Sequence, residues 1–275
     1  GGNPNLAPEV SDTYTAGVVF TPGEYVPGNL MVSVDYFDIT VDGYVSNVSP
    51  QTALDQCAET ADAFFCSLIN RAPNGSLWIS PAGYITATNV NTGSLSTSGL
   101  DFLLNWAVDF EELGLGNAGG LNVDFVGTYL MDLSTLELPG GIVPEYDCAG
   151  YYGSRCGSPN PTWRHKLRTT WQTPIGVDAT VTWRYFSSVI HGDSDSGPRS
   201  AVTDLDYELG TRNYIDLAAS YNVTENWNVR VGVNNLLDKD PPLTSQTAGF
   251  SNGNTYPQTY DAVGRFLFIG TTIDF

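Results

Sequence analysis

Aromatic side chains gather in two short stretches, SLWISPAGY and EYDCAGYYGSRCG, that could bind a ligand. Aromatic rings stack on the faces of sugars and on catecholate rings, so these stretches are candidate contacts for such molecules. A second interpretation is that the same rings pack the surrounding loops onto one another. The candidate ligand-binding residues are Trp78, Tyr84, Tyr146, Tyr151, Tyr152 and Arg155.

Both stretches lie near cysteines, which occur as two close pairs, Cys57 with Cys66 and Cys148 with Cys156. Local disulfides are predicted for both pairs, and they imply an oxidising compartment. Zinc is the alternative, but neither pair has the C-x2-4-C spacing of a structural zinc site and no histidine lies nearby. A loop that is pinned by a disulfide loses less conformational entropy when it binds a ligand.

Catalytic and metal-binding patterns are weak. A set of nucleophile, base and orienting residue cannot be picked out, so the sequence predicts no enzyme and no cofactor. The segment GDSDSG at 192–197 could offer carboxylates to calcium, but it lacks the spaced ligands of an EF-hand. The two histidines have no cysteine or histidine companion at metal spacing, so no metal site is predicted.

Composition restricts the partners and the fold. The net charge of −19, from 11 Lys and Arg against 30 Asp and Glu, argues against a nucleic acid or an anionic lipid surface, because both would repel the chain. The 29 glycines and 15 tyrosines are typical of a turn-rich β protein. Since no run of about twenty apolar residues is present, any membrane role falls to a β-barrel.

Alternating polarity recurs along the whole chain and predicts about nine strands. The links between these segments alternate between short turns and long loops. In an up-and-down antiparallel sheet all long loops then lie on one side, as in transmembrane barrels with long extracellular loops and short periplasmic turns. A soluble β-sandwich also alternates, but four long loops on one side are unusual for it. The predicted fold class is therefore all-β, a segment of an antiparallel transmembrane β-barrel.

The two faces of each strand then have different surroundings. The apolar face is expected to contact lipid and the polar face to line the lumen. Aromatic residues near the short turns fit the belt that such barrels place at the membrane interface. These belt candidates are Trp106, Trp171, Tyr221, Trp227 and Phe275.

Four stretches carry a family resemblance: NPNLAPEVSDTYTAGVVF at 3–20, LSTSGLDFLLNW at 95–106, VGVNNLLDKDPP at 231–242 and YDAVGRFLFIGTTIDF at 260–275. They resemble the C-terminal part of the β-barrel of a TonB-dependent outer-membrane receptor. The signal of the terminal strand in this resemblance consists of Gly264, Arg265, Ile273 and Phe275.

The resemblance implies a barrel of about 22 strands with a plug domain in its lumen. Residues 1–275 are expected to form the C-terminal part of that barrel, with the plug and the N-terminal strands lying upstream. Lysine and arginine at lumen-facing positions are expected to pair with carboxylates of the plug or the wall. These residues are Lys166, Arg168, Arg184 and Arg230.

The resemblance also implies a function in the outer membrane of a Gram-negative bacterium. The receptor would take up a scarce nutrient, a metal–siderophore complex, cobalamin or an oligosaccharide, using energy transmitted by TonB through the plug. The expected partners are membrane lipid, the plug and missing strands, TonB and a small-molecule ligand, and no nucleic acid. Two alternatives stay open: a barrel that displays adhesive loops at the cell surface, and a secreted soluble carbohydrate-binding β-domain.

Overall fold

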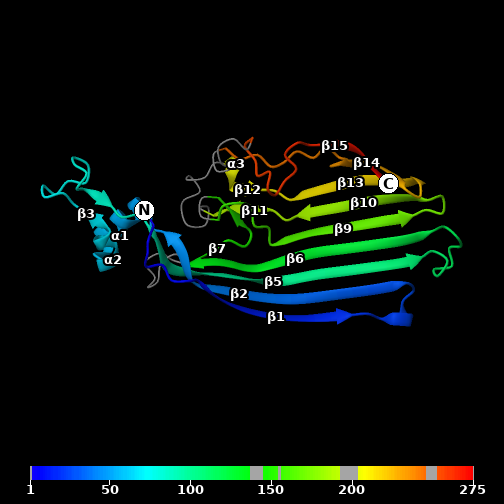
Figure 1. The fold of residues 1–275 in the computed structure, drawn as a ribbon, viewed down its shortest axis with the longest axis horizontal. Coiled ribbons are helices and arrows are strands. Elements are labelled where there is room, and N and C mark those ends of the chain that lie inside the picture. Colours follow the sequence, from blue (N-terminus) through cyan, green and yellow to red (C-terminus); the bar gives the residue numbers. More distant parts are fainter. Residues whose placement is uncertain (1, 137–144, 154–155, 193–203, 246–252, 275) are drawn as a thin grey trace. The chain divides into compact units, whose positions relative to one another are not determined.

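A computed structural model describes residues 2–136, 145–153, 156–192, 204–245 and 253–274. Nine strands follow one another in chain order along one antiparallel sheet (Figure 1). The prediction of about nine antiparallel strands is confirmed. Their bounds are β1 (Val10–Phe20), β2 (Asn29–Asn47), β5 (Asn89–Asp109), β6 (Gly120–Leu136), β9 (Trp163–Gln172), β10 (Val177–Phe186), β13 (Arg212–Thr224), β14 (Trp227–Asn234) and β15 (Phe266–Ile273).

The connections alternate in length as predicted. Short turns follow β1, β5, β9 and β13, and the first of them contains the short 3₁₀ helix η1 (Gly23–Tyr25). Long connections follow β2, β6, β10 and β14. The strand path is open, because β1 and β15 stand at its two ends. A transmembrane barrel must close so that no backbone edge is left unpaired in lipid, so this sheet is part of a wall.

Contacts within the chain define two compact units. The first unit comprises Gly1–Thr13, Ile39–Ser96 and Ser134–Asp147, and the second comprises Tyr14–Asp38, Thr97–Leu133 and Cys148–Phe275. The boundaries cut through long strands. The helices in the described ranges are short, and none has the length and apolar character needed to span a membrane.

The first unit contains a small disulfide-linked module between β2 and β5. It consists of α1 (Pro50–Thr60), α2 (Ala63–Ser67) and the hairpin of β3 (Ile69–Asn70) with β4 (Tyr84–Ile85). Ser49 caps α1 through its hydroxyl, which accepts from the Thr52 amide, and Asp62 caps α2 through its carboxylate, which accepts from the Phe64 amide. The sequence pattern predicted one long loop here. Both helices start at a capping side chain, and α1 also has a proline at its first position. Their core of Val48, Ala53 and Phe65 is small.

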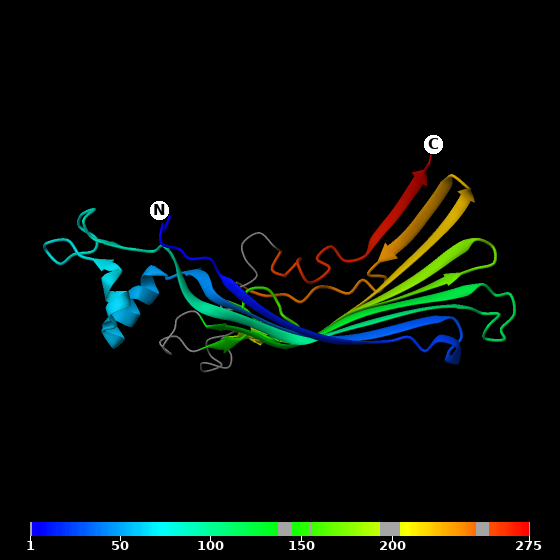
Figure 2. The ribbon, with the colours of Figure 1, turned by 60° about the horizontal axis from the view of Figure 1, so that its bottom comes forward.

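In the second unit, alternate residues of each strand point to opposite faces of the sheet. The apolar set is bare: Tyr14 and Val18 are each 71% exposed, and Leu267 and Ile269 are 73% and 78% exposed. Many apolar side chains are exposed in this way, which would be a liability in water and fits a surface that contacts lipid. Figure 2 shows these strands side by side, from blue β1 to red β15.

The long connections of the second unit build their own packed region. A three-stranded sheet forms from β8 (Tyr151–Tyr152), β11 (Val189–His191) and β12 (Glu208–Leu209), next to the short helix α3 (Asp204–Tyr207). Buried side chains from four segments meet there, and we call this set the loop core. Its members are Tyr152, Val189, Leu209, Tyr256 and Tyr260.

Candidate ligand-binding site

Two of the stretches that resemble the receptor family meet at one junction in the second unit. Asn235, directly after β14, is fully buried with a positive φ of 53°. Its side chain donates to the carbonyl of Lys239 (3.0 Å) and accepts from the Lys239 amide (2.8 Å). This closes a compact turn at the NNLLDKD stretch, a conformation that asparagine tolerates better than most residues. The motif therefore has a structural role in ending β14.

Asp238 in that turn holds the residues that begin the terminal strand. Its carboxylate accepts from the Arg265 amide at 2.8 Å and lies 3.9 Å from the Arg265 guanidinium. Gly264 has a φ of 70°, and a Cβ there would lie 2.9 Å from the Asp238 carboxylate. The positive φ favours glycine at this position, and a Cβ there would press on the carboxylate that accepts from the Arg265 amide. Ile273 ends β15, where it pairs with Trp227, and Phe275 lies outside the described residues.

Arg184 on β10 fastens the connection before β15 to the wall. Its guanidinium binds Asp216 of β13 (2.8 and 2.9 Å) and Asp261 (2.8 and 2.6 Å), so both carboxylates are held bidentately. Asp216 also accepts from the Asn235 amide at 2.8 Å. Arginine suits this position because its planar fork matches two carboxylates at once. The prediction that Arg184 pairs with wall carboxylates is confirmed.

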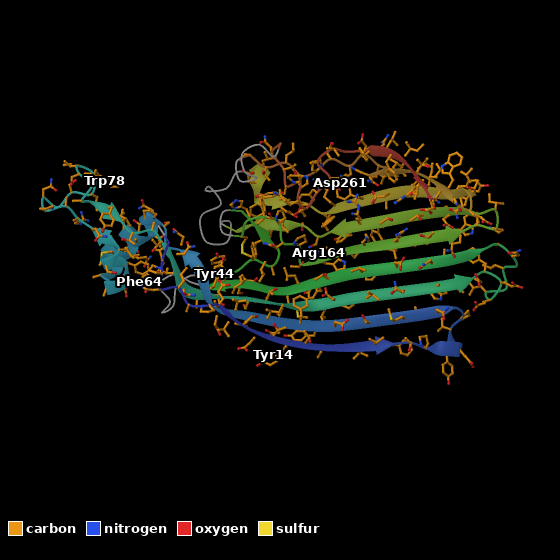
Figure 3. The ribbon with its side chains drawn as sticks, in the orientation of Figure 1. Tyr14, Tyr44, Phe64, Trp78, Arg164 and Asp261 are labelled. Carbon is orange, nitrogen blue, oxygen red and sulfur yellow. A yellow bond between two sulfur atoms is a disulfide. The ribbon has the colours of Figure 1, made fainter. Side chains whose placement is uncertain are left out.

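A cavity with a volume of about 760 Å³ lies beside this clamp, between the wall and segment 257–264. The register places the lining residues on one face, with Arg184 opposite Lys166 and Thr182 opposite Arg168. The predicted lumen-facing side thus lines a hollow, as expected. Figure 3 labels two residues on this side of the unit, Arg164 on β9 and Asp261.

The second disulfide joins Cys148 to Cys156 beside the loop core. Tyr152 has no exposed surface, and its hydroxyl donates to the main-chain oxygen of Asp206. Burial raises the pKa of the Tyr152 phenol, and the charge of Asp206 adds to this shift, so the ring stays neutral. The placement of Tyr152 favours packing between loops over ligand contact.

The neighbouring candidates differ from Tyr152. Tyr151 is half-buried in β8, and Tyr146 is half-buried in β7 (Tyr146–Asp147), which pairs with the end of β6. Tyr146 belongs to the first unit and Tyr151 to the second. Arg155 lies outside the described residues. For these residues a ligand contact stays a prediction.

The first disulfide joins Cys57 to Cys66 and so ties α1 to α2. The following hairpin carries Trp78 and Tyr84, which are 82% and 55% exposed. The Ser76 hydroxyl accepts from the amides of Trp78 and Ile79 (3.1 and 3.2 Å), so the backbone at the tip is ordered although the Trp78 ring is free. Figure 3 shows Trp78 at this hairpin, with Phe64 on the helical module. Trp78 and Tyr84 are thus the exposed aromatic residues of this hairpin, and a ligand contact by them stays a prediction.

Four of the predicted belt residues, Trp106, Trp171, Tyr221 and Trp227, lie at the short-turn ends of the strands, and Phe275 lies outside the described residues. The indole of Trp106 donates to the Pro27 carbonyl, Trp171 to the Ala118 carbonyl (both 2.9 Å) and Trp227 to the Thr271 hydroxyl (2.7 Å). Each indole therefore satisfies its only polar atom on the protein and presents its apolar surface outward. An amphipathic ring with this arrangement suits the interface between lipid and water.

Metal binding finds no support within the described ranges, where no group of three or more His, Cys, Asp or Glu residues is placed to hold an ion. Of the GDSDSG segment at 192–197, residues 193–197 lie outside those ranges. His165 lies among aromatic rings, and its Nδ1 accepts from the Trp163 indole at 2.9 Å. His191 is 3% exposed and packs edge-on against Tyr152.

Several solved structures share this fold. The ferric enterobactin receptor of Pseudomonas aeruginosa (G324V mutant) superposes with a TM-score of 0.61 at 16% identity, covering 97% of this chain and 31% of that one. The siderophore receptor PirA of Acinetobacter baumannii gives 0.59 at 15% identity, covering 100% and 33%. The FrpB iron transporter of Neisseria meningitidis gives 0.59 at 12% identity, covering 98% and 32%. Among curated protein sequences no relative matches the chain.

The fold and its two-faced strands define a wall segment of an antiparallel outer-membrane type of β-barrel. The chain belongs to the family of the TonB dependent receptor-like β-barrel, whose model matches residues 1–236. This is a family of transport receptors that reside in the outer membrane of Gram-negative bacteria. The chain spans about a third of the length of the solved receptors above.

Sequence reasoning missed the residues that build the cavity from the loop side. Asp261 and Tyr260 were part of the terminal motif stretch, but their types alone did not show that they face β10. The available signal was the position of Asp261 a few residues before the terminal strand. The predicted lumen-facing Arg184 was the cation that could pair with it. A carboxylate there is the natural partner for a lumen arginine, but the pairing depends on the register of the four strands β10, β13, β14 and β15.

Proposed function

We propose that this chain forms part of the wall and the outer loops of a receptor that takes up a scarce nutrient across the outer membrane of a Gram-negative bacterium. The observation that supports this proposal most directly is the family match over residues 1–236, together with an open sheet whose faces suit lipid and a lumen. We further propose that the rest of the barrel and a plug come from sequence outside residues 1–275, and that TonB supplies energy through the plug.

For the nutrient, we propose a metal–siderophore complex first and cobalamin or an oligosaccharide second. One of the similar structures is named a ferric enterobactin receptor and another a siderophore receptor. The exposed Trp78 and Tyr84 on a disulfide-pinned module offer aromatic surface to any of these ligands.

Transport is tested in a strain that lacks the complete receptor gene. The strain is grown under iron limitation with a panel of radiolabelled ferric siderophores, and in parallel with cobalamin and oligosaccharides. We expect at least one substrate to accumulate only when the gene is restored and only when TonB is present. Restored surface binding without uptake would instead support the adhesive barrel.

A matched pair of variants on adjacent residues of β10 tests which face of the sheet contacts lipid. Val181 belongs to the exposed apolar face, and Thr182 lines the cavity. In the full-length receptor we expect Val181→Arg to destabilise the barrel by about 2–4 kcal/mol, because the charge enters lipid. The control Thr182→Glu places a charge on the polar face opposite Arg168, and it should change stability by less than about 1 kcal/mol. Equal effects in guanidinium unfolding would contradict a lipid-facing apolar side and favour a soluble domain.

A further inference from the structure

The indole of Trp78 differs from those of the other five tryptophans, which all lie in the described ranges. Each of those five donates its indole N–H to an oxygen or nitrogen of the protein, and they are Trp106, Trp163, Trp171, Trp183 and Trp227. The Trp78 indole donates to none of the described residues, and its side chain is 82% exposed. Because the N–H is the only polar group of the ring, both the face and the donor of Trp78 are open to a molecule outside the chain.

The turn that carries Trp78 is ordered, although the ring itself is free. Asn74 Oδ1 accepts from the Ser76 amide at 3.1 Å, and the Ser76 hydroxyl accepts from the Trp78 amide at 3.1 Å. A Cβ on Gly83 would lie 2.6 Å from the Ser76 carbonyl oxygen, so the two sides of the hairpin approach each other closely at this glycine. A backbone that is held in this way loses little entropy when the ring binds a ligand.

Tyr84 adds a second exposed ring to the same hairpin. It lies opposite Asn70 in the pairing of β3 with β4, and its side chain is 55% exposed. Its hydroxyl, like the Trp78 indole, has no hydrogen-bond partner among the described residues. Rings that serve only to pack loops together are covered, as Tyr152 is. The hairpin therefore presents two rings and two donors that the fold does not use.

The surface around these rings carries no charge. Residues 72–100 include no Asp, Glu, Lys or Arg, although charged residues make up 15% of the chain. The cation nearest to this stretch in sequence is Arg71, whose guanidinium donates to the Gly75 carbonyl at 3.1 Å. The helical part of the module adds three carboxylates, Asp55, Glu59 and Asp62. An anion would be repelled by these carboxylates, and a cation would find no carboxylate on the hairpin itself, so an uncharged ligand fits this surface best.

An uncharged saccharide matches this set of groups. One face of a pyranose ring presents C–H groups that pack on an aromatic face, and the sugar oxygens accept from N–H and O–H donors. A purely apolar partner would instead bury the Trp78 indole N–H and the Tyr84 hydroxyl without acceptors, which is unfavourable. The two donors therefore favour a saccharide over an apolar surface of another protein.

We propose that the hairpin of residues 69–85 binds an uncharged saccharide. Trp78 stacks on a pyranose face, and its indole N–H and the Tyr84 hydroxyl donate to sugar oxygens. The saccharide is either an oligosaccharide that the receptor takes up or a polysaccharide of the cell surface. The proposal rests on the proposed function in one respect only, namely that this connection lies outside the cell. It gives the hairpin a ligand class of its own, whether or not the transported nutrient is a metal complex.

The test measures saccharide binding by the purified full-length receptor in a detergent without a sugar headgroup. The probes are neutral gluco-, galacto- and manno-oligosaccharides, dextran, dextran sulfate and the surface polysaccharide of the host strain. Titration calorimetry measures affinity, and acrylamide quenching measures the exposure of tryptophan. We expect saturable binding of at least one neutral saccharide, protection of tryptophan from quenching, and an affinity that stays within about twofold between low and high salt. Dextran sulfate should bind no more tightly than dextran.

Variants on the hairpin separate stacking from general apolar contact. Trp78→Ala should weaken binding about fivefold or more, and Trp78→Phe should recover part of the loss, because it restores a ring without a donor. Ile79 provides the matched control, since it is 78% exposed beside Trp78 but has neither a ring nor a donor. Ile79→Ala should keep the affinity within about twofold, and Tyr84→Phe should lower it about threefold. Hydrogen exchange first shows that the module stays folded in each variant.

Two further assays separate the two sources of the saccharide. TonB-dependent uptake of the bound oligosaccharide, in radiolabelled form, would identify it as a nutrient. Binding of the host polysaccharide without uptake would identify the hairpin as an attachment to the cell surface.

Two results would overturn the proposal. One is failure of every neutral saccharide to bind the wild-type receptor. The other is an equal loss of binding in Trp78→Ala and Ile79→Ala, which would instead indicate an apolar docking surface for a protein. The binding assay needs neither TonB nor transport, so a failure of the transport proposal leaves its result interpretable.

Discussion

The two disulfide-linked regions carry similar sequence signals but use them in opposite ways. Cys57–Cys66 ties two short helices whose hairpin leaves Trp78 82% exposed. Cys148–Cys156 stands beside the loop core, where Tyr152 has no exposed surface. The comparison teaches that an aromatic residue near a disulfide is a ligand candidate only where the loop is too small to bury it. The first region leaves the Trp78 ring exposed, and the second buries the Tyr152 ring between its loops.

The largest expected effect separates the two rings directly. Tyr152→Ala should destabilise the outer loops of the full-length receptor by about 3–5 kcal/mol, because it empties the centre of the loop core. Trp78→Ala should change their stability by less than about 0.5 kcal/mol. Hydrogen exchange of the loop peptides in both variants measures the difference. Comparable protection in the two variants would remove the distinction that we draw.

Removing each disulfide in turn compares how much the two crosslinks stabilise the backbone of their own regions. The cysteines are 9 and 8 residues apart in the two regions. Loop-closure entropy therefore predicts similar losses, about 2.5 kcal/mol for each Cys-to-Ser pair. We expect proteolysis near α1 and α2 in one variant and near β8 in the other. Loss of protection in both regions from a single variant would show that the two regions do not open independently.

The ionisation of buried tyrosines at alkaline pH tests the packing of the loop core. The pKa values of Tyr152 and Tyr260 are raised in the folded receptor, each mainly by burial. Their packing therefore contributes full stability below the unfolded tyrosine pKa of about 10 and is lost as the pH rises above it. We expect tyrosinate absorbance to appear in two phases, with exposed rings first and the loop core later. The late phase should lose the absorbance of two tyrosinates in the double variant Tyr152→Phe with Tyr260→Phe.

The smallest expected change in stability carries the most information on function. Trp78→Ala leaves the module folded, and Tyr84→Ala is its partner variant on the same hairpin. If the ring stacks on a nutrient, its loss should weaken binding by about 1 kcal/mol, or roughly fivefold. Tyr25, an exposed residue of η1 on the short-turn side, supplies the control Tyr25→Ala. Unchanged affinity in Trp78→Ala would assign the nutrient contacts to other loops.

Strand positions were predictable because the alternation of polar and apolar residues indicates both that a segment is a strand and which residues lie on each of its faces. Lys166 and Arg168 were placed on the lumen side from their alternation with Trp163 and Leu167, and the cavity includes both cations. The helices α1 and α2 were not predicted, because a few residues between caps carry too little periodicity. Tyr152 and Trp78 could not be separated, because burial in a loop depends on contacts from distant segments such as Tyr256 and Tyr260.

The contact between Asp238 and Arg265 joins residues that are 27 positions apart. For the wall, it makes the long connection between β14 and β15 equivalent to a tight hairpin, since the chain between the two residues no longer affects the distance between the strand ends. Loop-closure entropy rises only slowly with length, so a longer connection adds little to the free energy that forming this contact costs. The connection can therefore change in length and sequence, and so in ligand contacts, while the register of the last strand stays fixed.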